Sequence, residues 1–283
     1  MSAPSHPSHS RITQHLIALI EAGATLADCP WYRDGVSHRP INAHTHARYS
    51  GINVLTLWAA ADEFGYSSGQ WATYKQWQTL GAQVQRGESG VPILFYKPIE
   101  RASTEDAEER DRFMIARTSR VFAAEQVEGY TLPQAPTATS FTPIDRVESL
   151  LNETQAQVEH RGDRAFYNRT QDLIVMPEQT RFFDQESYYA VKLHEFVHWT
   201  GAAHRCDRDI TSYAIEELVA ELGAAFLCAD LDITLTPRED HAGYLASWLH
   251  CLTADPTALS RAASLASRAA AYICDFEPKT SQP

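Results

Sequence analysis

Residues 194–204 read His-Glu-Phe-Val-His-Trp-Thr-Gly-Ala-Ala-His, and this stretch decides how the C-terminal half of the chain is interpreted. Two histidines four positions apart on a helix lie on one face, so the imidazoles of His194 and His198 can reach a single metal ion. Glu195 is then placed to accept a proton from a metal-bound water, as in a zinc-dependent peptidase. Asp184 as N-cap and Gly201 beyond the C-terminus delimit the helix. Such a short match also arises by chance in buried helices that contain two histidines.

The third metal ligand has two candidates, and the first is His204. It completes the pattern H-E-x-x-H-x-x-G-x-x-H, in which the glycine turns the chain back toward the metal. Proteins built on that pattern also carry a methionine turn below the metal. The methionines of this chain are Met1, Met114 and Met176, and all of them precede the motif. The sequence therefore argues against His204.

The second candidate is Glu217, on the predicted helix that follows. Tyr213, Glu217, Glu221 and Ala224 recur at intervals of four, four and three, so they share one helical face. Two carboxylates on an apolar helix are costly to bury unless they bind a metal or a partner. We expect Glu217 to be the ligand and Glu221 to accept a hydrogen bond from a ligand histidine. Tyr213 is a candidate donor to a developing oxyanion or, alternatively, a core tyrosine, and Glu216 is expected to be solvated.

Composition sets the broad class of the protein. With 283 residues, 44% of them hydrophobic and 21% charged, the chain is expected to form two globular domains. No apolar run approaches the roughly 20 residues that span a bilayer, and the N-terminus lacks the apolar core of a signal peptide. Five widely spaced cysteines without a C-x-x-C motif indicate reduced thiols. These features predict a cytoplasmic protein that does not bind membranes.

The predicted fold class is α+β in two domains. Residues 1–128 would form an α+β domain, residues 129–143 a Pro- and Thr-rich linker, and residues 144–283 a mostly helical domain with a small sheet. In the first domain, strands at 91–97 and 114–122 are expected to pair, which would make the acidic segment 100–111 an exposed hairpin insertion.

The net charge of −12 is uneven along the chain. Residues 129–283 carry a balance of −10 and residues 1–128 only −2, so a nucleic-acid surface is expected in the N-terminal half. Aromatic side chains interleaved with cations suit unpaired bases and phosphates, although from the residues alone a half-buried aromatic core is the favoured interpretation. The candidate DNA-binding residues are Arg48, Tyr49, Asn53, Trp71, Tyr74, Lys75, Trp77, Arg86 and Lys97.

Several motifs resemble those of one protein family in the same order. The N-terminal motifs are Pro40-x-Asn42, the run from Tyr49 to Asn53, Trp71-x-Thr73-Tyr74-Lys75-Gln76, Gly81 and Gly87-Glu88. The C-terminal motifs are Tyr167-Asn168, Asp172-x-Ile174-x-Met176-Pro177, the 194–201 motif, Arg205, Arg208 and the run from Glu216 to Glu221. Together they resemble the ArdC-type antirestriction proteins of conjugative plasmids, in which a zincin-like metallopeptidase domain follows a single-stranded-DNA-binding domain.

The resemblance implies that His194, His198 and Glu217 hold a metal, most simply zinc, with manganese as an alternative divalent ion. It also implies binding of single-stranded DNA and protection of incoming plasmid DNA from host restriction. It names no peptidase substrate, and our hypothesis is that restriction enzymes or other DNA-bound proteins are the targets. The alternative is a DNA-shielding protein whose metal site is structural or regulatory. Glu195 favours the peptidase, because a purely structural site needs no general base and is usually closed by a fourth protein ligand.

Overall fold

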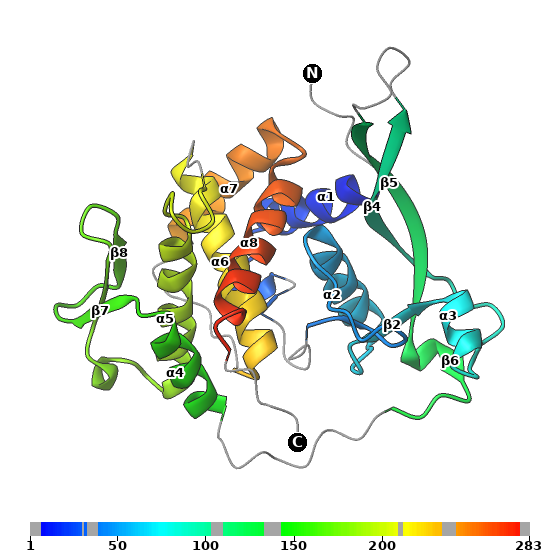
Figure 1. The fold of residues 1–283 in the computed structure, drawn as a ribbon, viewed down its shortest axis with the longest axis horizontal. Helices are drawn as coiled ribbons and strands as arrows, with labels where there is room; N and C mark the ends of the chain where they lie inside the picture. Colours follow the sequence, from blue (N-terminus) through cyan, green and yellow to red (C-terminus); the bar gives the residue numbers. More distant parts are fainter. Residues whose placement is uncertain are drawn as a thin grey trace. The chain divides into compact units, whose positions relative to one another are not determined.

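A computed structural model describes residues 7–29, 31–32, 39–102, 110–132, 143–208, 212–233 and 242–277. The chain divides into two compact units. We call residues 1–40, 48–67 and 133–283 the helical unit, and residues 41–47 and 68–132 the sheet unit. The α+β fold class in two parts is confirmed, with a mostly helical C-terminal region and a small sheet (Figure 1). None of the helices within the described ranges is both long and apolar enough to cross a membrane.

The two units do not follow the boundaries predicted from the sequence. Those boundaries, 1–128 and 144–283, treated each domain as one continuous segment. Instead, α1 (Pro7–Glu21) and α2 (Ile52–Phe64) belong to the helical unit. Buried side chains on both helices, including Leu16 and Leu55, join the same core as the C-terminal helices. The apolar faces of these helices, not their position in the sequence, decide where they pack.

The sheet unit is built on a four-stranded sheet of order β1-β2-β5-β4. Its strands are β1 (Ile41–Asn42), β2 (Gln70–Thr73), β4 (Val91–Ala102) and β5 (Arg110–Ala123). The long β4–β5 hairpin confirms the predicted strand pair, with Val91 opposite Val121 and Ala102 opposite Arg110. The centre of the acidic segment, residues 103–109, lies outside the described residues.

A short helix and a second small sheet complete the sheet unit. The helix α3 (Tyr74–Thr79) begins at a capping box, in which Thr73 and Gln76 satisfy each other's backbone N–H groups. The strands β3 (Gln83–Val84) and β6 (Val127–Glu128) pair antiparallel, and η2 (Ala124–Gln126) precedes β6. Trp77 fills the core of this unit and donates its indole N–H to the carbonyl of Phe122 at 3.0 Å.

The remaining elements of the helical unit follow the linker region. They are α4 (Pro143–Glu153), β7 (Gln157–His160), β8 (Phe166–Asn168), β9 (Leu173–Met176), η3 (Gln179–Arg181), α5 (Gln185–Thr200), α6 (Tyr213–Leu231), α7 (Ala242–Ala254) and α8 (Ala258–Cys274). The three short strands form a sheet of order β7-β9-β8, in which β7 is parallel and β8 antiparallel to β9. A further turn, η1 (Leu26–Asp28), precedes the buried Cys29 and Trp31.

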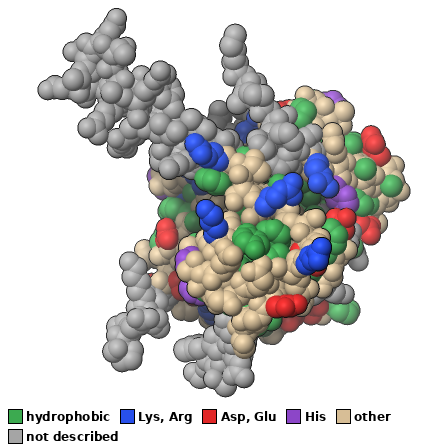
Figure 2. Space-filling model, turned by 90° about the vertical axis from the view of Figure 1, so that its right-hand side faces the viewer, with side chains coloured by type: hydrophobic (Ala, Val, Ile, Leu, Met, Phe, Trp, Pro, Cys, Tyr) green, Lys and Arg blue, Asp and Glu red, His purple; other side chains and the backbone are tan. Residues whose placement is uncertain are grey.

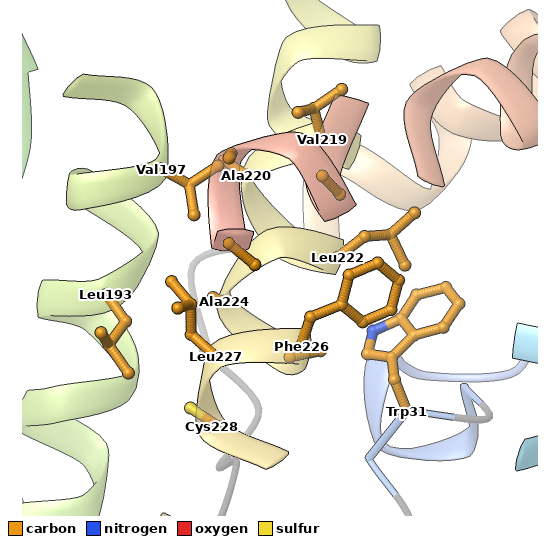
Figure 3. Close-up of a cluster of buried hydrophobic side chains, with 14 of the residues drawn as sticks. Trp31, Leu193, Val197, Val219, Ala220, Leu222, Ala224, Phe226, Leu227 and Cys228 are labelled. Atoms are coloured by element: carbon orange, nitrogen blue, oxygen red, sulfur yellow. The ribbon is translucent and has the colours of Figure 1, made fainter. Parts of the chain in front are cut away.

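The helices α5 and α6 form the centre of the helical unit, and both are buried along most of their length. The side chain of Asp184 caps α5 by accepting from the N–H of Ser187 at 2.7 Å, as the sequence predicts. Val197 of α5 lies beside Ala220 of α6, and Trp31 packs near Leu222 and Phe226 (Figure 3). The five cysteines are free, as expected for reduced thiols.

Gly223 sets how closely α5 and α6 approach. A Cβ atom at this position would lie 2.7 and 2.8 Å from the two methyl carbons of Val197, which is closer than real side chains come. Val197 itself is completely buried and cannot move into solvent. The small residue is therefore required by the neighbouring helix and not by backbone conformation.

We predict that Gly223→Ala destabilises the protein. Overpacking of about 1–3 kcal/mol should exceed the gain of about 1 kcal/mol in helix propensity. The measurement is the urea unfolding midpoint in the presence of a chelator, so that bound metal does not contribute. The control is a cycle with Val197→Ala: Gly223→Ala should cost less in the Val197→Ala background than in the parent protein, because the new methyl group then has space. A single variant as stable as the parent protein would contradict this packing.

Candidate metal centre

Three side chains from α5 and α6 converge inside the helical unit. The Nε2 atoms of His194 and His198 lie 3.1 Å apart. Glu217 places one carboxylate oxygen 3.5 Å from Nε2 of His194 and the other 3.5 Å from Nε2 of His198. A tetrahedral zinc ion with bonds of about 2.0–2.1 Å holds adjacent donors roughly 3.3 Å apart. The triangle of donor atoms therefore has the size and the chemistry for a divalent metal ion.

The helix geometry explains why these three side chains meet. His194 and His198 are one turn apart on α5 and therefore share the face that packs on α6. Glu217 lies on the buried side of α6, with only 6% of the residue exposed. Glu195, next to the first histidine, is 3% exposed, and its charge acts on His198. The predicted ligand set and general base thus occur together in one buried cluster.

Glu216 corrects an expectation from the sequence, which placed it in solvent. It is only 6% exposed and lies between two cationic groups. Its carboxylate accepts from Nε and Nη2 of Arg208 at 2.9 and 2.6 Å and is 3.1 Å from Nδ1 of His198. Arg208 also donates to the carbonyl of Val197 and the hydroxyl of Thr200, so it joins the end of α5 to α6. Glu216 therefore orients His198 from the side opposite the metal triangle.

Glu221 lies near the other histidine. Its Oε2 atom is 3.6 Å from Nδ1 of His194, and the residue is 2% exposed. Its other oxygen accepts a hydrogen bond from the hydroxyl of Tyr32. Tyr32 is 189 positions away in the sequence and was not among the candidate site residues. No short motif could have identified it, because the contact depends on where the N-terminal segment packs.

Neither His204 nor Tyr213 is part of the triangle of His194, His198 and Glu217. The side chain of His204 is 67% exposed and lies 3.6 Å from Asp172, while Glu217 occupies the third position beside the two histidines. Tyr213 is 66% exposed at the first residue of α6, which rules out the alternative of a core tyrosine. Arg205 binds Asp172 at 2.5 Å and lies 3.8 Å above the ring of Trp199. Through these two contacts, Arg205 connects the end of α5 to the loop between β8 and β9.

The charges of the cluster stabilise one another. Burial lowers the pKa of His198, but hydrogen bonds to Glu216 and Glu217 and the nearby charge of Glu195 outweigh burial and raise this pKa to about 9. Burial raises the pKa of Glu217, yet the two histidines lower it by a larger amount, so its net pKa lies below the ordinary value. The pKa of Glu216 is also lowered, since Arg208 and His198 outweigh its burial. In the metal-free protein His198 is therefore protonated at neutral pH.

Comparisons with known proteins place this chain in a family. Residues 7–122 match the family described as the N-terminal domain of anti-restriction factor ArdC, and residues 145–265 match the zincin-like metallopeptidase family. The metal-free crystal structure of antirestriction protein ArdC from plasmid R388 superimposes with a TM-score of 0.79 at 33% identity, over 98% of this chain and 100% of that one. The chain belongs to the ArdC-type antirestriction proteins. The resemblance seen in its motifs is confirmed.

Other ArdC relatives agree with this assignment. The Mn(II)-bound structure of the R388 protein superimposes with a TM-score of 0.75 at 34% identity, over 96% of this chain and 99% of that one. The uncharacterized protein y4eC of Sinorhizobium fredii is 41% identical over 278 residues, which cover 94% of this chain and 91% of y4eC. A DNA primase TraC of Escherichia coli is 34% identical over 99% of this chain, but the match covers only 20% of TraC.

The structure corrects two of the candidate DNA-binding residues suggested for this ArdC-type chain. Trp71 and Trp77 are 1% and 0% exposed, so their rings cannot stack on bases, and Trp77 belongs to the core of the sheet unit. Tyr74, Lys75 and Arg86 are exposed in the same unit, as a binding surface requires. The side chain of Lys97 lies outside the described residues.

The other three candidates, Arg48, Tyr49 and Asn53, belong to the helical unit. Arg48 is exposed and pairs with Asp230 at 3.2 Å. The carbonyl of Tyr49 accepts from Arg39 at 3.2 Å, and Asn53 is half-buried near the start of α2. The nine candidates therefore do not form one surface of the sheet unit.

We predict that metal affinity rises with pH because binding must displace the proton of His198. Below a pKa of about 9, each pH unit should strengthen the apparent affinity for zinc about tenfold, and the affinity should level off above it. Calorimetry at pH 7.5 in two buffers of different ionisation enthalpy should detect release of about one proton per ion.

The matched variants are Glu216→Gln and the exposed Glu159→Gln. Glu216→Gln should weaken metal affinity by about 10- to 100-fold and move the pH dependence lower, since it removes a charge that holds the proton on His198. Glu159→Gln should leave both unchanged. An affinity that does not change between pH 6.5 and 8 would contradict the protonated state of the site.

Proposed function

We propose that this protein binds single-stranded DNA through its sheet unit and carries a zinc peptidase site in its helical unit. Together these would protect incoming plasmid DNA from host restriction in the cytoplasm. The observation that supports the catalytic part best is the buried triangle of His194, His198 and Glu217 beside Glu195, within an antirestriction family. Zinc is proposed because two imidazoles and a carboxylate form a common open catalytic ligand set, with manganese as the alternative ion.

The proposed reaction is hydrolysis of a peptide bond. When bound, the divalent ion polarises the scissile carbonyl and lowers the pKa of water at the open position. Glu195 would take the proton of the attacking water and pass it to the leaving amine. Tyr213, exposed at the start of α6, is proposed as a donor to the developing oxyanion.

The proposed DNA surface lies on the sheet unit and combines exposed aromatic rings with cations. Tyr74 is 43% and Phe95 42% exposed, and Phe95 is directly opposite the exposed Arg117 in the β4–β5 hairpin. Arg120 is also exposed and donates to the carbonyl of Gly90 at 2.8 Å. On the face in Figure 2, Lys and Arg side chains surround a central hydrophobic patch. Such a surface suits stacked bases with phosphates held at the rim.

Three of these residues were missing from the sequence-based candidates. Phe95, Arg117 and Arg120 lie on two strands, and only their pairing brings them together. Tyr74 contacts the ring of Phe122 edge-on at 6.4 Å, which holds the tyrosine at the surface. We therefore replace Trp71 and Trp77 by these residues in the proposed DNA surface.

We predict that Tyr74→Ala and Arg120→Ala weaken binding of a single-stranded oligonucleotide. Loss of one stacked base costs about 1–3 kcal/mol, which corresponds to roughly 5- to 150-fold for Tyr74→Ala. Arg120→Ala should also reduce the slope of log affinity against log salt by about 0.7. Fluorescence anisotropy at several salt concentrations measures both effects. The control is Phe183→Ala, which removes a fully exposed ring from the helical unit. A larger loss in that control than in Tyr74→Ala would contradict the proposed surface.

The two activities would cooperate if the peptidase acts on proteins bound to the same strand. Residues 129–283 carry a net charge of −10 and should repel DNA, so DNA is not the expected occupant of the metal site. A restriction enzyme or another protein on that strand would be presented at high local concentration. Proteolysis should then be slow on free proteins and stimulated by single-stranded DNA.

We predict that Glu195→Gln abolishes cleavage while the metal stays bound. Loss of the general base should reduce the rate by about 10²- to 10⁴-fold. The assay measures cleavage of DNA-bound proteins, including self-cleavage, with and without single-stranded DNA, together with the metal content. The control Glu178→Gln changes an exposed glutamate ahead of α5 and should cleave normally. Conjugation into a restricting recipient then decides between the two functions, since full protection by Glu195→Gln would favour DNA shielding without proteolysis.

A further inference from the structure

The N-terminal segment reaches the metal centre through Tyr32. This residue follows η1, and its backbone N–H donates to the carbonyl of Cys29 at 3.0 Å. Cys29 and Trp31, which both precede Tyr32, are 2% and 7% exposed and belong to the core of the helical unit. Trp31 packs near Leu222 and Phe226 of α6 (Figure 3). The tyrosine is thereby fixed against the helix that carries Glu217.

The hydroxyl of Tyr32 donates to Oε1 of Glu221. The other oxygen of Glu221 is 3.6 Å from Nδ1 of His194, and Nε2 of the same ring faces Glu217 and His198. Glu221 thus lies between a tyrosine of the N-terminal segment and a residue of the metal triangle. The contacts form one continuous path from Tyr32 to the metal triangle.

We propose that Tyr32 is a positioning residue of the metal centre, which holds Glu221 so that this carboxylate orients the ring of His194. The inference rests on the proposed metal site and deepens it. It implies that residues 145–265, which match the peptidase family, do not contain the complete centre. A residue from the part that matches the N-terminal ArdC family completes it.

The physical need for Tyr32 follows from the burial of Glu221. A carboxylate in apolar surroundings requires hydrogen-bond donors to remain charged and fixed in orientation. Burial, followed by the charge of Glu221, raises the pKa of Tyr32 well above its ordinary value, so the hydroxyl keeps its proton and acts as a donor. Removal of this donor leaves the carboxylate of Glu221 free to turn, and its hold on the ring of His194 then weakens.

The test compares Tyr32→Phe with Tyr167→Phe in the full chain. Both variants remove one hydroxyl that donates to a carboxylate in the helical unit, but Tyr167 binds Asp172 and not Glu221. Chelator competition with zinc should show affinity about tenfold weaker for Tyr32→Phe and unchanged for Tyr167→Phe. In the metal-free protein, the ring ¹⁵N resonances of His194 should shift in Tyr32→Phe alone. Once Glu221→Gln is present, adding Tyr32→Phe should change the affinity no further.

Three outcomes would overturn the proposal. One is unchanged zinc affinity and unchanged ¹⁵N resonances in Tyr32→Phe, and another is an equal loss of affinity in both variants, which would reflect general destabilisation. The third is additive losses in the Tyr32→Phe/Glu221→Gln double variant. If the parent protein bound no divalent ion, the proposed function would fail, whereas the metal-free ¹⁵N resonances would still decide whether Tyr32 orients His194.

Discussion

The close contact between α5 and α6 is the constraint on which the helical unit depends. Gly223 allows the two helices to approach until Val197 fills the space between them. At that separation, the imidazoles of α5 and the carboxylates of α6 come within 3–4 Å of one another inside an apolar core. A wider spacing would admit water and separate the donor atoms beyond the reach of a single ion. The polar cluster therefore exists because the apolar packing around it is tight.

Three buried glutamates on α6 have to be stabilised within this packing, and each is stabilised differently. Glu216 forms a bidentate ion pair with Arg208. Glu217 faces both histidines, and Glu221 accepts a hydrogen bond from Tyr32. Breaking a buried charge pair by removing one partner typically costs about 3–5 kcal/mol, so these partners are strongly constrained. The partners come from three separate parts of the chain. The candidate metal centre is consequently a product of the whole helical unit and not of one motif.

This origin explains what the sequence could and could not predict. Helical spacing placed His194, His198 and Glu217 on facing surfaces, because the contacts between them follow from two adjacent helices. Strand alternation likewise predicted the β4–β5 hairpin. The sequence predicts a solvated Glu216, because no local sequence pattern shows that the segment after α5 brings Arg208 into contact with α6. Trp71 and Trp77 were mistaken for surface residues because composition does not distinguish an aromatic core from a stacking surface. The compact units differ from the predicted domains because packing of α1 and α2 is a long-range property.

The most direct test of this account is a crystal structure of the protein with zinc or manganese, with the ion located by its anomalous scattering. The account predicts one strong peak about 2.0–2.2 Å from Nε2 of His194, Nε2 of His198 and a carboxylate oxygen of Glu217. It also predicts that Glu216 and Glu221 remain beside the outer nitrogens of the two rings. An ion bound by His204 in place of Glu217, or no peak between α5 and α6, would contradict it.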